Sequence, residues 1–303
     1  METKRKVMPF LWFDDQAEDA AKTYAGLFAD SALGEICRYS KRIAEATGRA
    51  EGSAMTVTFR LGGQEVTALN GGPQFRFTPS FSFFVNCGGV EEAEALFTGL
   101  AQGGEVMMPF QAYPFSAGYG WIKDRYGFSW QVNSAPRDHT IAPSLLFVGR
   151  QCGRAEEAMT LYGSIFPDSR IESVARYEAG EAPNAEGSVK HGIFFLAGQE
   201  LRAMDSALDH TFTFTEAASL QVLCDSQEEV DHYWHHLGEG GDPAAQQCGW
   251  LKDRFGVSWQ VVPRVLTEML SDAGSDAKER VTQAFMQMKK FDISALERAY
   301  RGN

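Results

Sequence analysis

Residues 121–132 read Trp-Ile-Lys-Asp-Arg-Tyr-Gly-Phe-Ser-Trp-Gln-Val, and residues 250–261 read Trp-Leu-Lys-Asp-Arg-Phe-Gly-Val-Ser-Trp-Gln-Val. Three of the twelve positions differ, and each difference exchanges one apolar or aromatic side chain for another. A match of this length indicates an internal duplication, and its period of about 130 residues is much longer than that of a solenoid repeat. The sequence therefore predicts two related modules in tandem.

Shorter matches extend the duplication over most of the chain. They predict a first module over residues 5–134 and a second over residues 141–263, joined by a short polar linker. A chain of 303 residues is long enough for two domains that each bury a core. The matched segments include 9–13 with 143–147, 20–24 with 158–162, 51–53 with 186–188, and 61–65 with 196–200.

Residue patterns within each module predict strands that alternate with helices. In the first module, apolar strands are expected at residues 11–13 and 81–85. Each is followed by a helical pattern with one apolar face, and further strands follow each helix. This order is β-α-β-β-β, and it occurs twice per module. The sequence therefore predicts an α+β fold that contains four such units.

Residues 264–303 have no counterpart in the first module and are predicted to form a helical tail. Val281, Ala284, Phe285 and Met288 fall at helical spacing, which indicates an amphipathic helix. We expect this helix to pack on the protein itself or on another copy. The alternative is that it binds a membrane or a different partner.

Bulk composition excludes several classes of function. The formal net charge is −12, whereas nucleic-acid binding requires a basic face, so no nucleic-acid partner is expected. No stretch approaches the roughly 18 apolar residues of a membrane span, and the N-terminus lacks the pattern of a signal peptide. The five cysteines include no Cys-x-x-Cys pair, which favours a reduced, cytoplasmic protein.

Two motifs together carry a resemblance to a known family. The first is Leu-Trp-Phe-Asp-Asp at 11–15 with the alanine-rich segment 17–21 and Tyr24, and the second is the segment 248–260. The chain resembles the vicinal oxygen chelate superfamily, which includes glyoxalase I, bleomycin-resistance proteins and extradiol dioxygenases. Within it, the chain is similar to the PhnB-like group, often labelled 3-demethylubiquinone-9 3-methyltransferase. The resemblance implies that two paired βαβββ units in each module form a cup for a ligand or a metal ion.

The metal-binding members use His or Glu side chains from the first, fourth, fifth and eighth strands, and these residues are replaced here. The eighth-strand position is Gln131 in one module and Gln260 in the other, and an amide is a poor ligand beside a carboxylate. The fourth-strand region of the second module offers only Asp205. We therefore expect no metal and no cofactor. The remaining positions are Met8 or Pro9, Ala142 or Pro143, Ser80, and Ala217.

Two further sequence patterns bear on the kind of site. His232 and His236 have metal-ligand spacing on a predicted helix, with His235 beside them. Val230, Tyr233, Trp234 and Leu237 mark the buried face of that helix, so the histidines are expected to be solvated. A methyl-donor site requires a glycine-rich turn between a strand and a helix, and the sequence contains no such turn.

The modules differ most before the repeated twelve-residue segment. The first has a longer connection that carries Phe110, Tyr113, Phe115 and Tyr119, which predicts either an aromatic lid over the cup or a cover for the joint between modules. Cys248 is interpreted as a pocket-lining residue, with a reactive thiol as the alternative. Candidate ligand-binding residues are Trp12, Ser80, Ser82, Tyr119, Gln131, Asp205, Ser219, Gln221, Cys248 and Gln260.

The sequence thus favours a protein that binds a small, partly aromatic organic molecule without metal; no catalytic residue is assigned. One alternative is an enzyme, either the methyltransferase of the family label or a divergent metal-dependent lyase or dioxygenase. Another is a structural or regulatory partner protein that acts through its tail. Pairing of two chains into a homodimer is left open.

Overall fold

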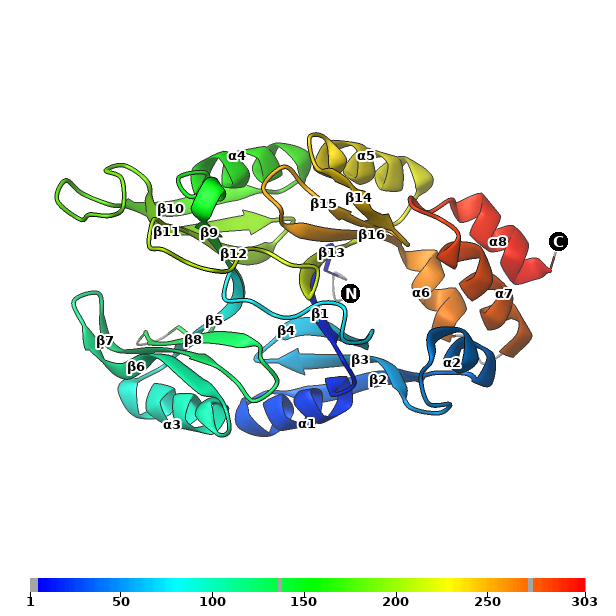
Figure 1. The fold of residues 1–303 in the computed structure, drawn as a ribbon, viewed down its shortest axis with the longest axis horizontal. Coiled ribbons are helices and arrows are strands. Elements are labelled where there is room, and N and C mark those ends of the chain that lie inside the picture. Colours follow the sequence, from blue (N-terminus) through cyan, green and yellow to red (C-terminus); the bar gives the residue numbers. More distant parts are fainter. Residues whose placement is uncertain (1–4, 136–137, 272–274, 303) are drawn as a thin grey trace.

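The computed structural model describes residues 5–135, 138–271 and 275–302, and it has an α+β fold of two eight-stranded sheets (Figure 1). The four predicted βαβββ units are present, which confirms the fold class. Residues 136–137 of the predicted linker and 272–274 of the tail lie outside the described residues.

The first module begins with β1 (Val7–Phe13), α1 (Ala17–Leu27), β2 (Ala32–Arg38), α2 (Lys41–Thr47), β3 (Ala54–Leu61) and β4 (Gln64–Asn70). Its second unit contains β5 (Phe81–Cys87), α3 (Val90–Ala101), β6 (Glu105–Tyr113), β7 (Ser116–Lys123) and β8 (Ser129–Ser134). Helix α2 was not predicted. Ser40 caps it, because its side chain accepts a hydrogen bond from the Ile43 N–H.

The second module repeats this order. Its first unit contains β9 (Ile141–Val148), the short helix η1 (Gly149–Gln151), α4 (Ala155–Ile165), β10 (Arg170–Arg176), β11 (Val189–Leu196) and β12 (Gln199–Ser206). Its second unit contains β13 (Ala218–Cys224), α5 (Gln227–Gly238), β14 (Asp242–Gln247), β15 (Trp250–Lys252) and β16 (Ser258–Pro263). The tail forms three helices, α6 (Arg264–Ser271), α7 (Ser275–Met286) and α8 (Ile293–Arg301).

The sheets differ from the expected arrangement in one respect: each combines units from both modules. Sheet A has the order β14-β15-β16-β13-β1-β4-β3-β2, and sheet B has the order β10-β11-β12-β9-β5-β8-β7-β6. Strand β1 pairs antiparallel with β13, and β5 pairs antiparallel with β9. Each cup is therefore shared between the modules. The sequence match identifies equivalent strands, but it does not specify which strand edges meet.

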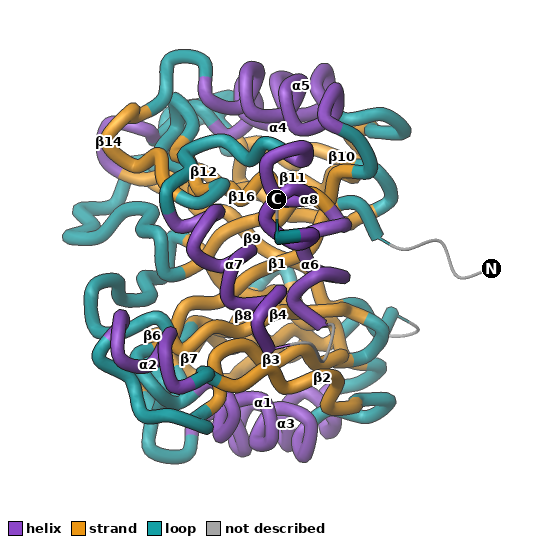
Figure 2. Tube along the Cα trace, turned by 90° about the vertical axis from the view of Figure 1, so that its right-hand side faces the viewer, coloured by secondary structure: helices purple, strands orange, loops and turns teal. Residues whose placement is uncertain are grey.

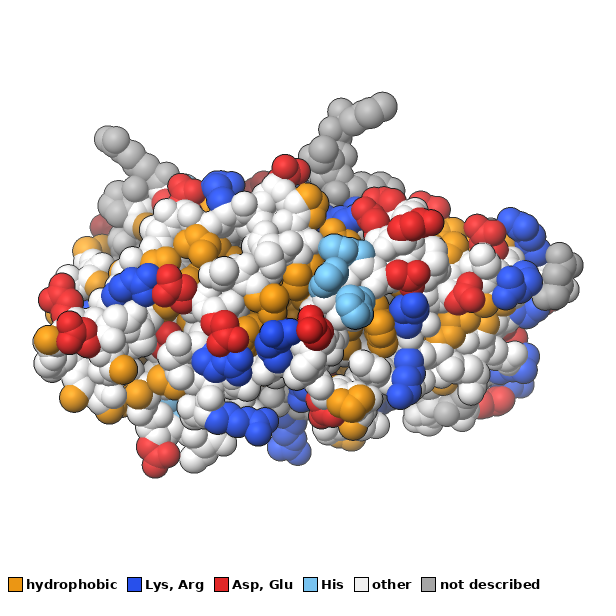
Figure 3. Space-filling model, turned by 90° about the horizontal axis from the view of Figure 1, so that it is seen from above, with side chains coloured by type: hydrophobic (Ala, Val, Ile, Leu, Met, Phe, Trp, Pro, Cys, Tyr) orange, Lys and Arg blue, Asp and Glu red, His pale blue; other side chains and the backbone are white. Residues whose placement is uncertain are grey.

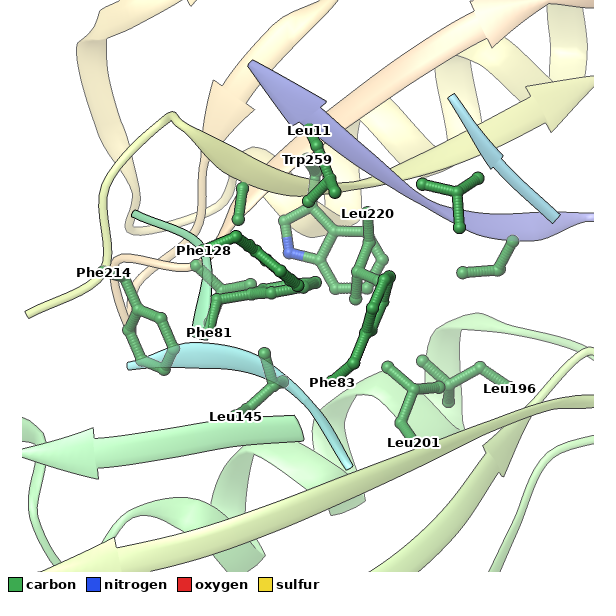
Figure 4. Close-up of a cluster of buried hydrophobic side chains, with 14 of the residues drawn as sticks. Leu11, Phe81, Phe83, Phe128, Leu145, Leu196, Leu201, Phe214, Leu220 and Trp259 are labelled. Carbon is green, nitrogen blue, oxygen red and sulfur yellow. The ribbon is translucent and has the colours of Figure 1, made fainter. Parts of the chain in front are cut away.

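The hydrophobic core is continuous between the two sheets (Figure 4). Leu11 and Leu220 come from central strands of sheet A, and Phe83 and Leu145 come from central strands of sheet B. Helices α1 and α5 pack on sheet A, and α3 and α4 pack on sheet B. Because side chains alternate along a strand, the residues between these core positions point to the opposite face of each sheet.

A buried carboxylate connects the two units of each module. The Oδ2 atom of Asp124, in the turn between β7 and β8, accepts hydrogen bonds from Tyr24 Oη at 2.6 Å and from Trp130 Nε1 at 2.7 Å. Its Oδ1 atom accepts from the backbone N–H groups of Tyr126 and Phe128. Tyr24 lies on α1, which covers sheet A, whereas the turn belongs to sheet B. The carboxylate therefore holds the two sheets together within one module.

The second module repeats this arrangement at Asp253, which accepts from Tyr162 Oη at 2.5 Å and from Trp259 Nε1 at 2.8 Å. Both tryptophans are fully buried, as their position opposite the glutamines in the strand pattern predicts. Burial raises the pKa of Asp253 to about 6 and also raises the pKa of Asp124, while the hydrogen bonds oppose the rise.

We expect Asp253→Asn to lower the free energy of unfolding by about 2 kcal/mol, because the amide leaves buried donors without an acceptor. The folded pKa of about 6 exceeds the roughly 3.9 of an unfolded aspartate, so the folded state binds more protons between about pH 4 and 6. Stability from this group therefore increases as the pH falls through that window. Urea unfolding at pH 7.5 and pH 5 measures both effects.

The control is Asp209→Asn, since Asp209 is exposed. It should match the wild type at both pH values, and Asp253→Asn should show a smaller gain in stability at pH 5. Equal stability of Asp253→Asn and the wild type would contradict the structural role of this carboxylate.

Candidate functional site

Each sheet has one face turned away from its helices, and we call these faces cup A and cup B. Three strands of cup B carry a row of polar side chains from both modules. Ser82 on β5 is the register partner of Ser144 on β9, and Ser144 is the register partner of Arg202 on β12. Residues paired in this way lie on one face with Cβ atoms roughly 5 Å apart. We call Ser82, Ser144 and Arg202 the donor row.

Gln131 on β8 connects this row to an aromatic hydroxyl. Its Nε2 donates to Ser82 Oγ at 2.9 Å and to Ser144 Oγ at 3.4 Å. Its Oε1 accepts from Tyr119 Oη at 2.8 Å. All four side chains are buried. Since both serine oxygens accept from the amide, their hydroxyl hydrogens stay available for another acceptor.

Arg202 completes the row and was not identified from the sequence. Its side chain lies 4.3 Å above the ring of Phe84, and only 4% of the residue is exposed. Its Nη2 donates to Glu200 Oε1 at 2.9 Å, and its Nη1 lies 3.3 Å from His191 Nε2. Its Nε has no hydrogen-bond partner in the part of the chain that the structure describes. Burial, assisted by Arg202, lowers the pKa of His191 to about 4, so this imidazole is neutral at pH 7.

The longer connection of the first module forms the β6–β7 hairpin. The rings of Tyr113 and Phe115 stack at 5.6 Å, and both contact Tyr119, at 5.8 and 5.2 Å. Phe115 is 64% exposed, whereas Tyr119 is buried. Phe110 belongs to the other face, where its ring contacts Phe97 of α3. Tyr119, Tyr113 and Phe115 therefore form a continuous aromatic contact from the polar network of cup B to the hairpin tip.

Cup A has the same strand arrangement and the same glutamine–serine hydrogen bond, but the neighbouring side chains differ. Gln260 Nε2 donates to Ser219 Oγ at 2.9 Å, as Gln131 does to Ser82. The register partner of Ser219 is Phe10, and that of Phe10 is Thr67. Cup A therefore has a phenyl ring and a threonine where cup B has Ser144 and Arg202. Alignment of the two modules pairs Phe10 with Ser144 and Thr67 with Arg202, so the sequence shows that these positions differ, but it does not place them beside Ser82.

The tail covers part of cup A (Figure 2). Leu266 and Met269 of α6 form a buried cluster with Leu223 and Val262 of the sheet. The Gly249 N–H donates to the backbone oxygen of Lys289 at 2.7 Å. Of the two packings expected for the tail, on the protein itself or on another copy, the structure shows the first. A cavity of about 600 Å³ is left between α6 and the sheet, and Met8, Thr67, Gln221 and Thr267 are among its lining residues.

Three other candidate residues are not members of the donor row. Asp205 accepts hydrogen bonds from the backbone N–H groups of Gly153, Ala155 and Val189, so it fixes the start of α4. Trp12 Nε1 donates to Gly72 O at 2.8 Å. The remaining candidate, Ser80, is fully buried, and its Oγ has no hydrogen-bond partner among the described residues.

Cys248 lies between β14 and β15, against the tail, and does not have the environment of a reactive thiol. Its backbone N–H donates to Met288 O in the tail at 2.8 Å. Its sulfur lies 3.5 Å from Gln247 Nε2, and burial raises the pKa of the thiol. Cys87 and Cys224 are buried in the core, and burial raises the pKa of each to about 12. These cysteines are therefore protonated at neutral pH.

The donor set of cup B does not fit a divalent cation. Hydroxyl, amide and guanidinium groups occupy the row and its surroundings, and a guanidinium repels a metal ion. The described residues contain no group of three or more His, Cys, Asp or Glu side chains that could hold a metal. The histidines of α5, His232, His235 and His236, are exposed on the surface (Figure 3). No helix within the described ranges is long and apolar enough to cross a membrane.

The paired βαβββ units give the chain the fold of glyoxalase I. A family model described as 3-demethylubiquinone-9 3-methyltransferase matches residues 5–133 and 139–262, and the chain belongs to this family. No curated protein matches the chain significantly.

Solved structures show two levels of similarity. A PhnB protein from Bacillus cereus is 38% identical over 43% of this chain and 100% of its own, with a TM-score of 0.40. A protein from Pseudomonas aeruginosa is 25% identical over 41% of this chain and 93% of its own, with a TM-score of 0.36. Glyoxalase I from Zea mays is 11% identical over 89% of this chain and 96% of its own, with a TM-score of 0.52. This last likeness supports the fold of the whole chain.

We expect Leu266→Ala to loosen the tail, because truncation of a buried leucine costs roughly 2–5 kcal/mol. Limited proteolysis should then cleave the region after residue 263 faster than in the wild type. Glu268→Ala, at an exposed position of the same helix, is the control and should leave the cleavage rate unchanged. Equal protection of the tail in Leu266→Ala would contradict its docking in cup A.

Proposed function

We propose that this protein binds a small, partly aromatic organic molecule in cup B and does so without a metal ion. The observation that carries the proposal is the hydrogen-bonded network of Gln131, Ser82, Ser144 and Tyr119 on one face of sheet B. Such a network orients a ligand through hydrogen bonds, while Phe84 and the hairpin aromatics supply apolar contact.

The two cups are not equivalent in this proposal. Cup B keeps a set of polar groups from both modules, whereas cup A has Phe10 in the central position and is partly covered by the tail. One chain is therefore expected to bind one ligand molecule at the network. The cavity beside α6 has a different lining and is not part of the proposed site.

Access to the network requires movement of the side chains above it. Gln131, Ser82 and Ser144 are almost completely covered, whereas Phe115 at the hairpin tip is exposed. The stacked rings of Tyr113 and Phe115 contact Tyr119, the outermost member of the network. We propose that this hairpin tip moves aside during binding and then closes over the aromatic part of the ligand.

The network favours binding over catalysis by a nucleophile. Burial raises the pKa of Tyr119, so its hydroxyl stays protonated, and burial also raises the pKa of the Cys248 thiol, which belongs to the other sheet. Neither group is activated in the way that nucleophilic catalysis requires. The methyltransferase wording of the family description has no support from the residues of the network.

Isothermal titration of the untagged protein in the presence of EDTA tests this proposal, with benzoate, 1-naphthol, 1-naphthoate and 1-naphthamide as probes. We expect saturable binding of at least one probe at one molecule per chain. Gln131→Leu should weaken that binding by roughly tenfold, because it removes the hydrogen bonds that orient the network.

Gln260→Leu is the matched control, since Gln260 occupies the equivalent position in cup A. Its affinity for the probe should equal that of the wild type. Binding that disappears with EDTA and returns with a divalent ion would contradict the metal-independent site. The absence of binding by every probe, or equal losses in the two variants, would contradict the assignment to cup B.

A further inference from the structure

The hydrogen-bond inventory of cup B shows which kind of ligand atom the site can receive. Ser82 and Ser144 both accept from Gln131, so each presents a hydroxyl hydrogen. Arg202 presents its Nε–H, which has no partner among the described residues although the residue is only 4% exposed. The donor row therefore offers three hydrogen-bond donors and no unoccupied carboxylate.

From this we infer that the ligand is an aromatic carboxylate, with its carboxylate bound by Arg202 and Ser144 and its ring directed toward Phe84 and the hairpin. The inference rests on the proposed function, because it names the ligand class of the same site. One carboxylate oxygen accepts from Arg202 Nε–H, and the other accepts from the adjacent hydroxyl of Ser144. Paired oxygen atoms match two neighbouring donors better than a single hydroxyl group does.

The surroundings of Arg202 keep its Nε available for such an oxygen. Glu200 binds Nη2, and His191, the neighbour of Nη1, is neutral. The charge of Asp138 also acts on Arg202, but its carboxylate accepts a hydrogen bond from Asn86, and no described residue accepts from the Arg202 Nε–H. The ring of Phe84 holds the guanidinium plane at 4.3 Å, which fixes its direction before a ligand arrives.

The equivalent positions in cup A cannot bind a carboxylate in this way. Thr67 stands at the register position of Arg202, and Phe10 stands at that of Ser144. The selectivity for a carboxylate should therefore belong to cup B alone. A guanidinium fixed in the sheet provides the positive charge that a bound metal ion provides in other proteins, and it does so through directed N–H donors.

The test compares 1-naphthoate with 1-naphthamide, which share a ring system but differ in charge. Isothermal titration is performed on the wild type, on Arg202→Gln and on the control Arg60→Gln. Arg60 is a suitable control because it lines the cavity of cup A. We expect the wild type and Arg60→Gln to bind the acid at least tenfold more tightly than the amide. Arg202→Gln should lose this preference through weaker binding of the acid, with the affinity for the amide nearly unchanged.

Ser144→Ala is a second variant, which removes one donor and leaves the buried ion pair of Arg202 and Glu200 intact. Ser144→Ala should also reduce the preference for the acid. If Arg202→Gln does not fold, Ser144→Ala provides the test in its place. Equal binding of acid and amide by the wild type, with affinity still dependent on Gln131, would overturn this inference and leave the proposed function standing. No binding of either probe would overturn both.

Discussion

The buried carboxylates of Asp124 and Asp253 are the constraint on which the rest of the structure depends. Each accepts a tyrosine hydroxyl, an indole N–H and two backbone N–H groups, so these four donors share one buried acceptor group. This arrangement explains why the repeated segment keeps Asp, Gly and Trp at fixed spacing. The aspartate accepts the backbone of the turn, Gly127 adopts a positive φ of 88°, and Trp130 returns to the same carboxylate.

The position of these carboxylates also determines how the modules combine. Since Asp124 links α1 to the β7–β8 turn, the two units of one module are held through their helix-covered faces. The edges of β1 and β5 then pair with strands of the other module, which places residues of both modules on each cup. In cup B, Ser82 and Gln131 come from the first module, whereas Ser144 and Arg202 come from the second. The candidate site therefore requires both modules of the chain.

Much of this structure could be predicted from local sequence, and the rest depends on long-range pairing. The duplication, the unit order, the buried tryptophans and the position of Gln131 beside Ser82 follow from repeats and strand alternation. Ser144 and Arg202 could not be placed there, because their neighbours are set by contacts between modules. Asp205 appeared to be a polar candidate for the cup, but the N–H groups at the start of α4 already use its carboxylate.

The differences between the cups and the position of the tail have a common physical cause. In cup B, Asn86 and Asn133 bind each other, with the Asn133 amide donating at 2.8 Å. The equivalent residues of cup A are Leu223 and Val262, and these contact the tail cluster around Leu266. A helix that docked on the asparagines would cover amide groups instead of apolar side chains, so it would gain less from hydrophobic burial. An apolar surface is therefore a condition for tail docking, and the polar residues of cup B do not provide one.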